Sequence, residues 1–264
     1  MPKQYALSIN HVSKTLGGQK RINDMSIHCE YGQIYGLIGP NGSGKTTLLK
    51  LITGLYQPDE GEILAGGLDP IRNYKKVRRQ FGLLPQDTAL YPELTAKQNL
   101  EFHGALYFHN MKELAQRIQE ILTLIDLKER QNEPVKRFSG GMKRRLGIGL
   151  ALLNDPQLIF FDEPTLGVDV HNSHRIWEYI RTLKAQNKTV IVTTNVMSEA
   201  DHLCDKLFII DHGVKICEGT PDALKESIGA KPVKIIKKPS LDDVFVYYTG
   251  CIYFYVIRWR FISV

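Results

Sequence analysis

Polar and apolar side chains alternate in places along the first 35 residues. Leu7 and Ile9 alternate with polar neighbours, and the apolar residues Met25, Ile27 and Cys29 share one parity. A period of two residues predicts short antiparallel strands with one buried face. The segment 33–38, which reads QIYGLI, predicts a buried strand directly before a glycine-rich loop.

Helical periodicity follows between about residues 95 and 130. The apolar residues in the second half of this stretch lie on one helical face, which we interpret as part of the core. They are Leu114, Ile118, Ile121, Leu122 and Ile125. Two further helices are predicted at 46–55, after the glycine-rich loop, and at 140–153, after Ser139.

The second half of the chain alternates between apolar runs and helical segments. The run 158–161 is continuous and ends at Asp162, as expected for a strand buried on both faces of a parallel sheet. Further strands are predicted at 189–193 and 207–210, and further helices at 172–186 and 197–203. This order predicts an α/β fold with a mainly parallel sheet, from which a helical insertion at about 86–155 projects.

Length and composition are those of one large folded domain, or of a domain with an attached subdomain. The chain has 264 residues, 43% hydrophobic and 23% charged, and a net charge of +6. Six basic and two acidic residues lie after residue 230, so +4 of that charge belongs to the C-terminal end. The remaining residues are nearly neutral, which argues against nucleic acid as a partner of the main domain.

The spacing of the cysteines and the length of the apolar runs indicate in which cellular compartment the chain works. The four cysteines, Cys29, Cys204, Cys217 and Cys251, form no CxxC pair, so we expect reduced cytosolic thiols. The N-terminal residues lack the apolar core of a signal peptide, and no run of about 18 apolar residues exists. Work at a membrane would therefore require a partner that spans it.

The glycine-rich loop fits the phosphate-binding pattern G-x-x-x-x-G-K-[ST]. Its residues are Gly39, Pro40, Asn41, Gly42, Ser43, Gly44, Lys45 and Thr46, and Thr47 follows. Glycines let the backbone curl so that its N–H groups grip phosphate oxygens, and the next helix adds its positive N-terminal end. We expect Lys45 to reach the β- and γ-phosphates and the Thr46 hydroxyl to ligate Mg²⁺.

Two adjacent carboxylates end the buried strand at 158–162. Ligands of open α/β sheets bind at the carboxyl ends of strands, so Asp162 is placed to hold the Mg²⁺ shell. Successive residues of a strand point in different directions, so Glu163 is free for another task. We interpret Glu163 as the general base for the attacking water.

Ser139, Gly140 and Gly141 open the helix predicted at 140–153. Serine is a good N-cap, and glycines allow a ligand to approach the backbone closely, so this is a candidate second anion site. An ordinary capped helix explains the same residues. For the segment 139–142 alone, the ordinary capped helix is the preferred interpretation.

Taken in order, these residues resemble the nucleotide-binding domain of ABC transporters over about residues 4–228. The matching motifs are Walker A at 39–46, Gln86 of the Q-loop, Phe138–Met142 of the signature, Leu158–Asp162 of Walker B, Glu163, and Asp169 of the D-loop. Segments 166–169 and 239–245 look most like the drug-resistance and ABC-2 exporter ATPases. The resemblance implies a domain at 1–228, with a helical subdomain at about 86–155, and a C-terminal extension at 229–264.

The resemblance also implies a mechanism and partners. Two ATPase subunits, identical or different, would face each other head to tail, each ATP lying between Walker A of one and Ser139, Gly140 and Gly141 of the other. Gln86 would sense the γ-phosphate and Mg²⁺, and a surface near 91–93 would receive a multi-span membrane permease. The protein would then be peripheral, at the cytoplasmic face of the cell membrane.

Two departures from the family pattern, and the unusual C-terminal end, carry expectations. Asn195 stands where the family usually has a histidine, which predicts slower hydrolysis because asparagine does not become a cation. Leu16 stands where an aromatic residue usually stacks on adenine, which predicts weaker base selectivity. The end 251–261 is apolar and aromatic with two arginines, and is either an interfacial contact or an aberrant end.

Two other functions remain open. One is a soluble ABC ATPase for assembly, and the other is a module that binds ATP and hydrolyses it slowly because of Asn195. The presence of Glu163 argues against the second. The transported substrate is outside what this sequence determines, because a membrane subunit would recognise it.

Overall fold

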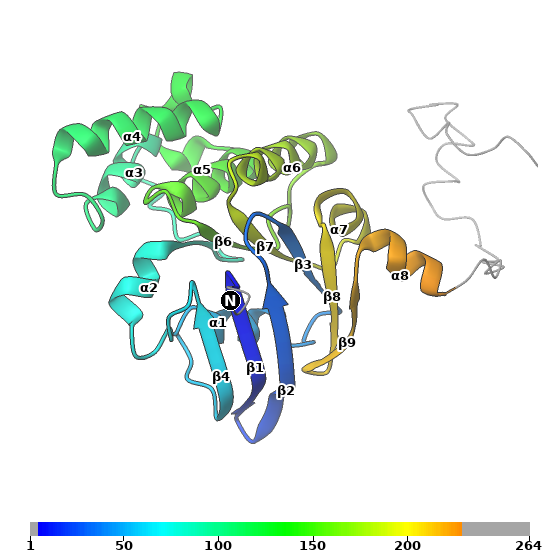
Figure 1. Ribbon diagram of the computed structural model, residues 1–264. Helices are drawn as coiled ribbons and strands as arrows, with labels where there is room; N and C mark the ends of the chain where they lie inside the picture. Colours follow the sequence, from blue (N-terminus) through cyan, green and yellow to red (C-terminus); the bar gives the residue numbers. More distant parts are fainter. Residues whose placement is uncertain (1–4, 229–264) are drawn as a thin grey trace, which may run out of the picture. The chain divides into compact units, whose positions relative to one another are not determined.

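The computed structural model describes residues 5–228, and within them the side chains of all but residues 170 and 171. The chain divides into two units, Met1–Ser227 and Ile228–Val264. The helices and strands below belong to the first unit (Figure 1). The apolar, basic end and the segment 239–245 lie outside the described residues.

A six-stranded sheet forms the centre of the unit, in the order β5-β6-β7-β3-β8-β9. Its strands are β3 (Ile34–Ile38), β5 (Phe81–Leu84), β6 (Leu158–Asp162), β7 (Thr189–Thr194), β8 (Lys206–Asp211) and β9 (Val214–Gly219). All neighbours pair in parallel except β8 and β9. Every residue of β3, β6 and β7 is buried, which explains their continuous apolar runs.

The two faces of this sheet pack into different cores. Along β3, Ile34 and Ile38 belong to a core shared with the helices between residues 96 and 203, whereas Tyr35 and Leu37 belong to a core shared with the N-terminal strands. β6 divides in the same way between alternate residues. The two-residue period of a strand thus distributes apolar side chains to both faces.

The N-terminal strands form a second, antiparallel sheet. β1 (Leu7–Leu16) pairs on one side with β2 (Gln19–Cys29) and on the other with β4 (Glu60–Ala65). Met25, Ile27 and Cys29 are buried, so the predicted parity is confirmed. Helix α1 (Lys45–Ile52) shares the core of this sheet.

Helices cover the other face of the large sheet. They are α3 (Ala96–Gly104), α4 (Met111–Leu124), α5 (Gly140–Leu152), α6 (Val170–Ala185) and α7 (Met197–Leu203). The predicted apolar stripe from Leu114 to Ile125 is buried throughout. In Figure 1, α3 and α4 lie beyond α5, on the side away from β1, β2 and β4. The fold is therefore α/β, with a mainly parallel sheet, an antiparallel N-terminal sheet and a helical subdomain.

Some elements have little periodic signal and were not predicted. They are β4, β5, β9, α2 (Tyr74–Gln80) and α8 (Pro221–Ser227). α8 contacts β9 at the edge of the large sheet. Between residues 5 and 228, no helix has the length and apolar character needed to cross a membrane.

Candidate functional site

The glycine-rich loop joins β3 to α1, and its glycines are required by geometry. Gly44 has φ 108°, and a Cβ there would lie 2.9 Å from the Arg21 carbonyl oxygen. A Cβ on Gly39 would lie 2.1 Å from the Ile210 carbonyl oxygen. Since α1 begins at Lys45 without a side-chain cap, its first N–H groups are available to an anion.

A cavity of about 350 Å³ opens over this loop. Its lining consists of Arg21, Asn41, Gly42, Gly44, Lys45, Thr46, Thr47, Gln86 and Glu163. Residues from β2, the loop, the end of β5 and the end of β6 thus converge on one space. Gln86 and Glu163 were predicted from different parts of the sequence, and the fold brings both to the phosphate loop.

Lys45 is buried beneath the loop. Its Nζ donates hydrogen bonds to the carbonyl oxygens of Gly39 at 2.7 Å and Pro40 at 3.0 Å. Burial lowers the pKa of Lys45, and the carboxylates of Glu163 and Asp162 oppose that shift. A bound phosphate would therefore meet an ammonium group that gains from a new anionic partner.

Asp162 and Thr46 are joined across the site. The Thr46 hydroxyl donates to Asp162 Oδ2 at 3.2 Å, and the Thr193 hydroxyl donates to Asp162 Oδ1. Asp162 is buried, whereas Thr46 is exposed to the cavity. A hydroxyl and a carboxylate at this separation form an oxygen-rich position of the type that Mg²⁺ prefers.

Glu163 has a strained backbone. Its φ is 49°, in the left-handed region, which costs a residue with a side chain about 1–3 kcal/mol. Its N–H donates to the carbonyl oxygen of Thr193 at 3.0 Å and to the Thr193 hydroxyl at 3.1 Å. The strand thus ends in a sharp change of direction that leaves Glu163 at the cavity and Asp162 buried beneath it.

Asn195 lies at the rim of the loop. Its Nδ2 donates to Asn41 Oδ1 at 3.4 Å, so the residue after β7 approaches the loop. Leu16 is half-buried at the end of β1 and does not line the cavity. Arg21, five residues later on β2, does line it.

Ser139 begins α5 away from this cavity. Its hydroxyl accepts from the Met142 N–H at 3.2 Å, and both Ser139 and Gly140 are exposed. A Cβ on Gly141 would lie 3.1 Å from the Asn172 side chain, so this glycine permits close packing against α6. Asp169 is exposed and caps α6 by accepting from the Asn172 N–H at 3.0 Å.

Three residues at the site were missed by reasoning from the sequence. Arg21 lines the cavity from an antiparallel strand whose neighbours only the fold determines. Thr193 lies opposite Asp162 in the pairing of β6 with β7. The register of this pairing cannot be predicted from the sequence. Arg144 hydrogen-bonds the main chain of Asp162 and Glu163 from the second turn of α5.

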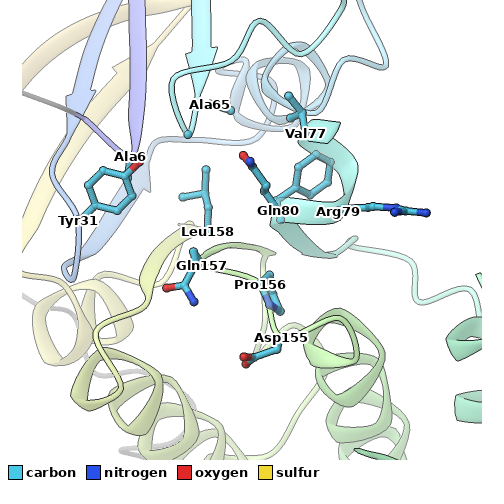
Figure 2. A pocket seen from close by; sticks show the side chains of 12 residues that line it. Ala6, Tyr31, Ala65, Val77, Arg79, Gln80, Asp155, Pro156, Gln157 and Leu158 are labelled. Carbon is cyan, nitrogen blue, oxygen red and sulfur yellow. The ribbon is translucent and has the colours of Figure 1, made fainter. Parts of the chain in front are cut away.

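A second cavity, of about 310 Å³, lies at the opposite end of β6 (Figure 2). Apolar side chains and two amides form much of its wall: Ala6, Ala65, Val77, Leu158, Gln80 and Gln157. Figure 2 shows Arg79 extending away from the middle of this space. This second cavity lies at the amino end of the parallel strands, whereas ligands of such sheets bind at the carboxyl ends. The cavity over the glycine-rich loop, at the carboxyl ends, is therefore the candidate functional site.

Related proteins are known for this chain. Residues 22–166 match the family model described as ABC transporter. The chain is 42% identical over 231 residues to the Nod factor export ATP-binding protein I of Sinorhizobium fredii, which covers 87% of this chain and 67% of that protein. It is 36% identical over 240 residues to the linearmycin resistance ATP-binding protein LnrL of Bacillus subtilis, covering 91% and 77%. The daunorubicin resistance ATP-binding protein DrrA3 of Streptomyces coeruleorubidus is 36% identical over 231 residues, covering 88% and 73%.

Solved structures show the same architecture. The ATP binding subunit of an ABC transporter superimposes with a TM-score of 0.77 at 30% identity, covering 92% of this chain and 99% of that one. The dimeric bacterial ABC transporter cassette MJ0796 superimposes with a TM-score of 0.74 at 27% identity, covering 81% and 98%.

Proposed function

The chain belongs to the ABC transporter family, and from this premise we propose that it is the ATP-hydrolysing subunit of an exporter. It binds ATP and is an ATPase. Export is proposed because the relatives above are named for Nod factor export and for resistance to linearmycin and daunorubicin. The observation that carries the proposal is the convergence of Lys45, Thr46, Gln86 and Glu163 on one cavity.

In this proposal the loop holds the phosphates. The N–H groups at the start of α1 face the anion, and Lys45 exchanges part of its bonding to Gly39 and Pro40 for phosphate oxygens. Thr46 and Asp162 would hold Mg²⁺, and Gln86, which lines the same cavity, would contribute to its coordination. The ion would neutralise charge on the phosphates.

Glu163 takes the proton of the attacking water. It lines the cavity, and its neighbour Asp162 is occupied with the hydroxyls of Thr46 and Thr193. The two carboxylates thus have separate tasks. Asn195 donates a hydrogen bond at the edge of the loop, and in this proposal its amide would meet the γ-phosphate.

A second ATPase subunit completes each site. Ser139 and Gly140 are exposed at the beginning of α5 and do not line the cavity of their own chain. An exposed helix start of this kind suits the γ-phosphate held by another copy or a related subunit. The dimeric cassette among the structural relatives supports this arrangement. ATP would join the two chains, and hydrolysis would release them.

The membrane permease would dock beside the Q-loop. Gln86 is followed by a loop that contains Tyr91, and the buried Asn99 of α3 accepts from the Tyr91 N–H at 2.9 Å and donates to the Tyr91 carbonyl oxygen at 3.1 Å. Tyr91 packs edge-on against Phe102, which is 54% exposed, and Leu106 nearby on the chain is 70% exposed. A cavity of about 270 Å³, lined in part by His103 and Tyr107, lies next to this apolar surface.

That surface suits an apolar segment from a multi-span membrane subunit. The ATPase would then be peripheral, at the cytoplasmic face of the membrane. Replacing Phe102 and Leu106 together by aspartate should abolish co-purification with a multi-span protein and leave ATP binding unchanged. Co-purification that survives both changes would refute this location, and the absence of any such partner for the unchanged chain would favour a soluble ATPase for assembly.

The nucleotide site is tested by Lys45→Ala with Lys50→Ala as the matched control. Both lysines lie on α1, but Lys50 stacks over Tyr56 and does not line the cavity. Loss of charge-assisted bonds of about 2–3 kcal/mol should weaken ATP binding about 30- to 150-fold in the first variant only. Glu163→Gln should retain binding and lose most turnover. If Lys45→Ala bound ATP as tightly as Lys50→Ala and the unchanged protein, the proposal would be contradicted.

A further inference from the structure

Arg144 is a buried arginine, and all but one of its hydrogen bonds go to main-chain carbonyls. It is the fifth residue of α5 and is 5% exposed. Its guanidinium donates to five carbonyl oxygens and one hydroxyl, those of Pro85, Gln86, Asp162, Glu163, Pro164 and Thr88. A buried guanidinium that is bonded by its whole planar fork holds the groups around it in one arrangement.

Its acceptors lie at the ends of two neighbouring strands. Nη1 donates to the carbonyl oxygens of Pro85 at 2.9 Å and Gln86 at 3.0 Å, immediately after β5. Nη2 donates to the carbonyl oxygen of Glu163 at 2.7 Å, immediately after β6. β5 and β6 pair in parallel, so Arg144 bridges the two strand ends from above the sheet edge.

Glu163 depends on such support because its backbone is in the left-handed region. Thr193 holds its N–H, and Arg144 holds its carbonyl oxygen, so the main chain is fixed on both sides of the strained residue. The Nε of Arg144 fixes the next carbonyl oxygen, that of Pro164, at 2.9 Å. The direction of the Glu163 side chain follows from these constraints.

We propose that Arg144 is a positioning residue that ties the signature helix to Glu163 and Gln86. The proposal rests on the proposed function, in which Glu163 activates water and Ser139 binds the partner's nucleotide. Ser139 caps α5 and Arg144 lies on its second turn. A shift of the helix start toward a nucleotide therefore carries the guanidinium, and with it both active-site loops, in the same direction.

The test compares Arg144 with its neighbour Arg145. Arg145 is equally buried, at 7% exposed, but donates to the carbonyl oxygens of Ile125 and Asp126 and to the Asp126 carboxylate, within the helical subdomain. Arg144→Lys and Arg145→Lys each keep a positive charge and lose the planar fork. They remove similar bonds at different places, so Arg145→Lys controls for a loss of stability.

The full chain is used to measure kcat for ATP, the affinity for ADP, and the urea midpoint. Arg144→Lys should lower kcat about 100-fold, as expected for a misplaced catalytic group, while its ADP affinity stays within about threefold. Arg145→Lys should retain kcat within about threefold, even if its urea midpoint falls. Arg144→Gln, which has one amide in place of the fork, should be at least as slow as Arg144→Lys.

A purely structural role would give a different pattern. If Arg144→Lys and Arg145→Lys lose kcat equally for the same fall in urea midpoint, or if ADP affinity falls along with kcat, the positioning role is wrong. Should Arg144→Lys be too unstable to purify, Thr88→Val removes one acceptor of its fork, and an unchanged kcat in that variant would refute the bridge. Failure of the proposed function is distinct, since Glu163→Gln would then turn over ATP normally.

Discussion

Thr193→Val isolates one hydroxyl beneath the active site. Thr193 is fully buried on β7, and its hydroxyl donates to the Asp162 carboxylate while accepting from the Glu163 N–H at 3.1 Å. Valine keeps the shape and the β-branched backbone preference but has no hydroxyl. The Glu163 N–H retains its bond to the carbonyl oxygen of residue 193, so the principal loss falls on Asp162.

A hydrogen bond to a buried carboxylate contributes about 1.5–3 kcal/mol, and we expect a loss of about 2 kcal/mol in the free energy of unfolding. With a urea dependence of about 2 kcal/mol per molar, the midpoint should fall by about 1 M. Because the same hydroxyl helps to place Glu163, ATP turnover should fall about tenfold, equivalent to about 1.4 kcal/mol.

Thr189→Val is the matched control at the other end of β7. Its hydroxyl accepts one neutral bond, from the Gly32 N–H at 3.0 Å, so its loss should cost about 1 kcal/mol and leave turnover unchanged. Urea unfolding and steady-state ATP hydrolysis measure both variants. A free energy of unfolding for Thr193→Val within about 0.5 kcal/mol of the unchanged protein, or equal turnover for the two variants, would refute the reasoning.

Asn195→His should raise ATP turnover, because histidine adds a group that can be cationic beside the γ-phosphate; an unchanged rate would refute the expectation that asparagine at this position slows hydrolysis. GTP should compete with ATP nearly as well as ATP itself, because Leu16 has no π-face and does not line the cavity, and the described residues that line it include no aromatic ring; a strong preference for ATP in competition assays would count against this. Arg21→Ala should weaken ATP binding about fivefold at low salt by removing a cation from the cavity wall, and binding that does not change would show that Arg21 points elsewhere when ATP is bound. Burial raises the pKa of Cys29 and Cys204 well above 9.0, so only the unfolded chain loses these protons as the pH rises past 9. Stability should therefore fall by about 1 kcal/mol per thiol between pH 9 and 10, and a Cys29→Ala, Cys204→Ala variant with the same alkaline loss would exclude these thiols as the cause.

Segments with strong periodicity were predictable to within a few residues. The strand at 158–162 and the helix at 140–152 appear where apolar runs and caps placed them. β5 has four residues and follows α2 without a break, so no window of sequence separates the two. β9 has exposed and half-buried residues in alternation and lacks the apolar run that marks its neighbours.

The residues of the candidate site also differ in how far the sequence predicts them. The phosphate loop was predictable because its requirements are local: positive φ at Gly42 and Gly44, with a strand before and a helix after. Asp162 and Glu163 were predictable because a continuous apolar run ends in front of them. The roles assigned to Ser139 and Asp169 remain predictions, since each concerns contact with another chain.

The sequence by itself determined the α/β class, the phosphate loop and the paired carboxylates, because each is encoded within a window of a few to about fifteen residues. Only the tertiary structure decided that Arg144 meets carbonyl groups up to 59 residues away, that Thr193 lies opposite Asp162, and that Arg21 reaches the cavity. These contacts depend on which strands become neighbours and in which register. That choice is made by the packing of both cores at once, so no local pattern records it.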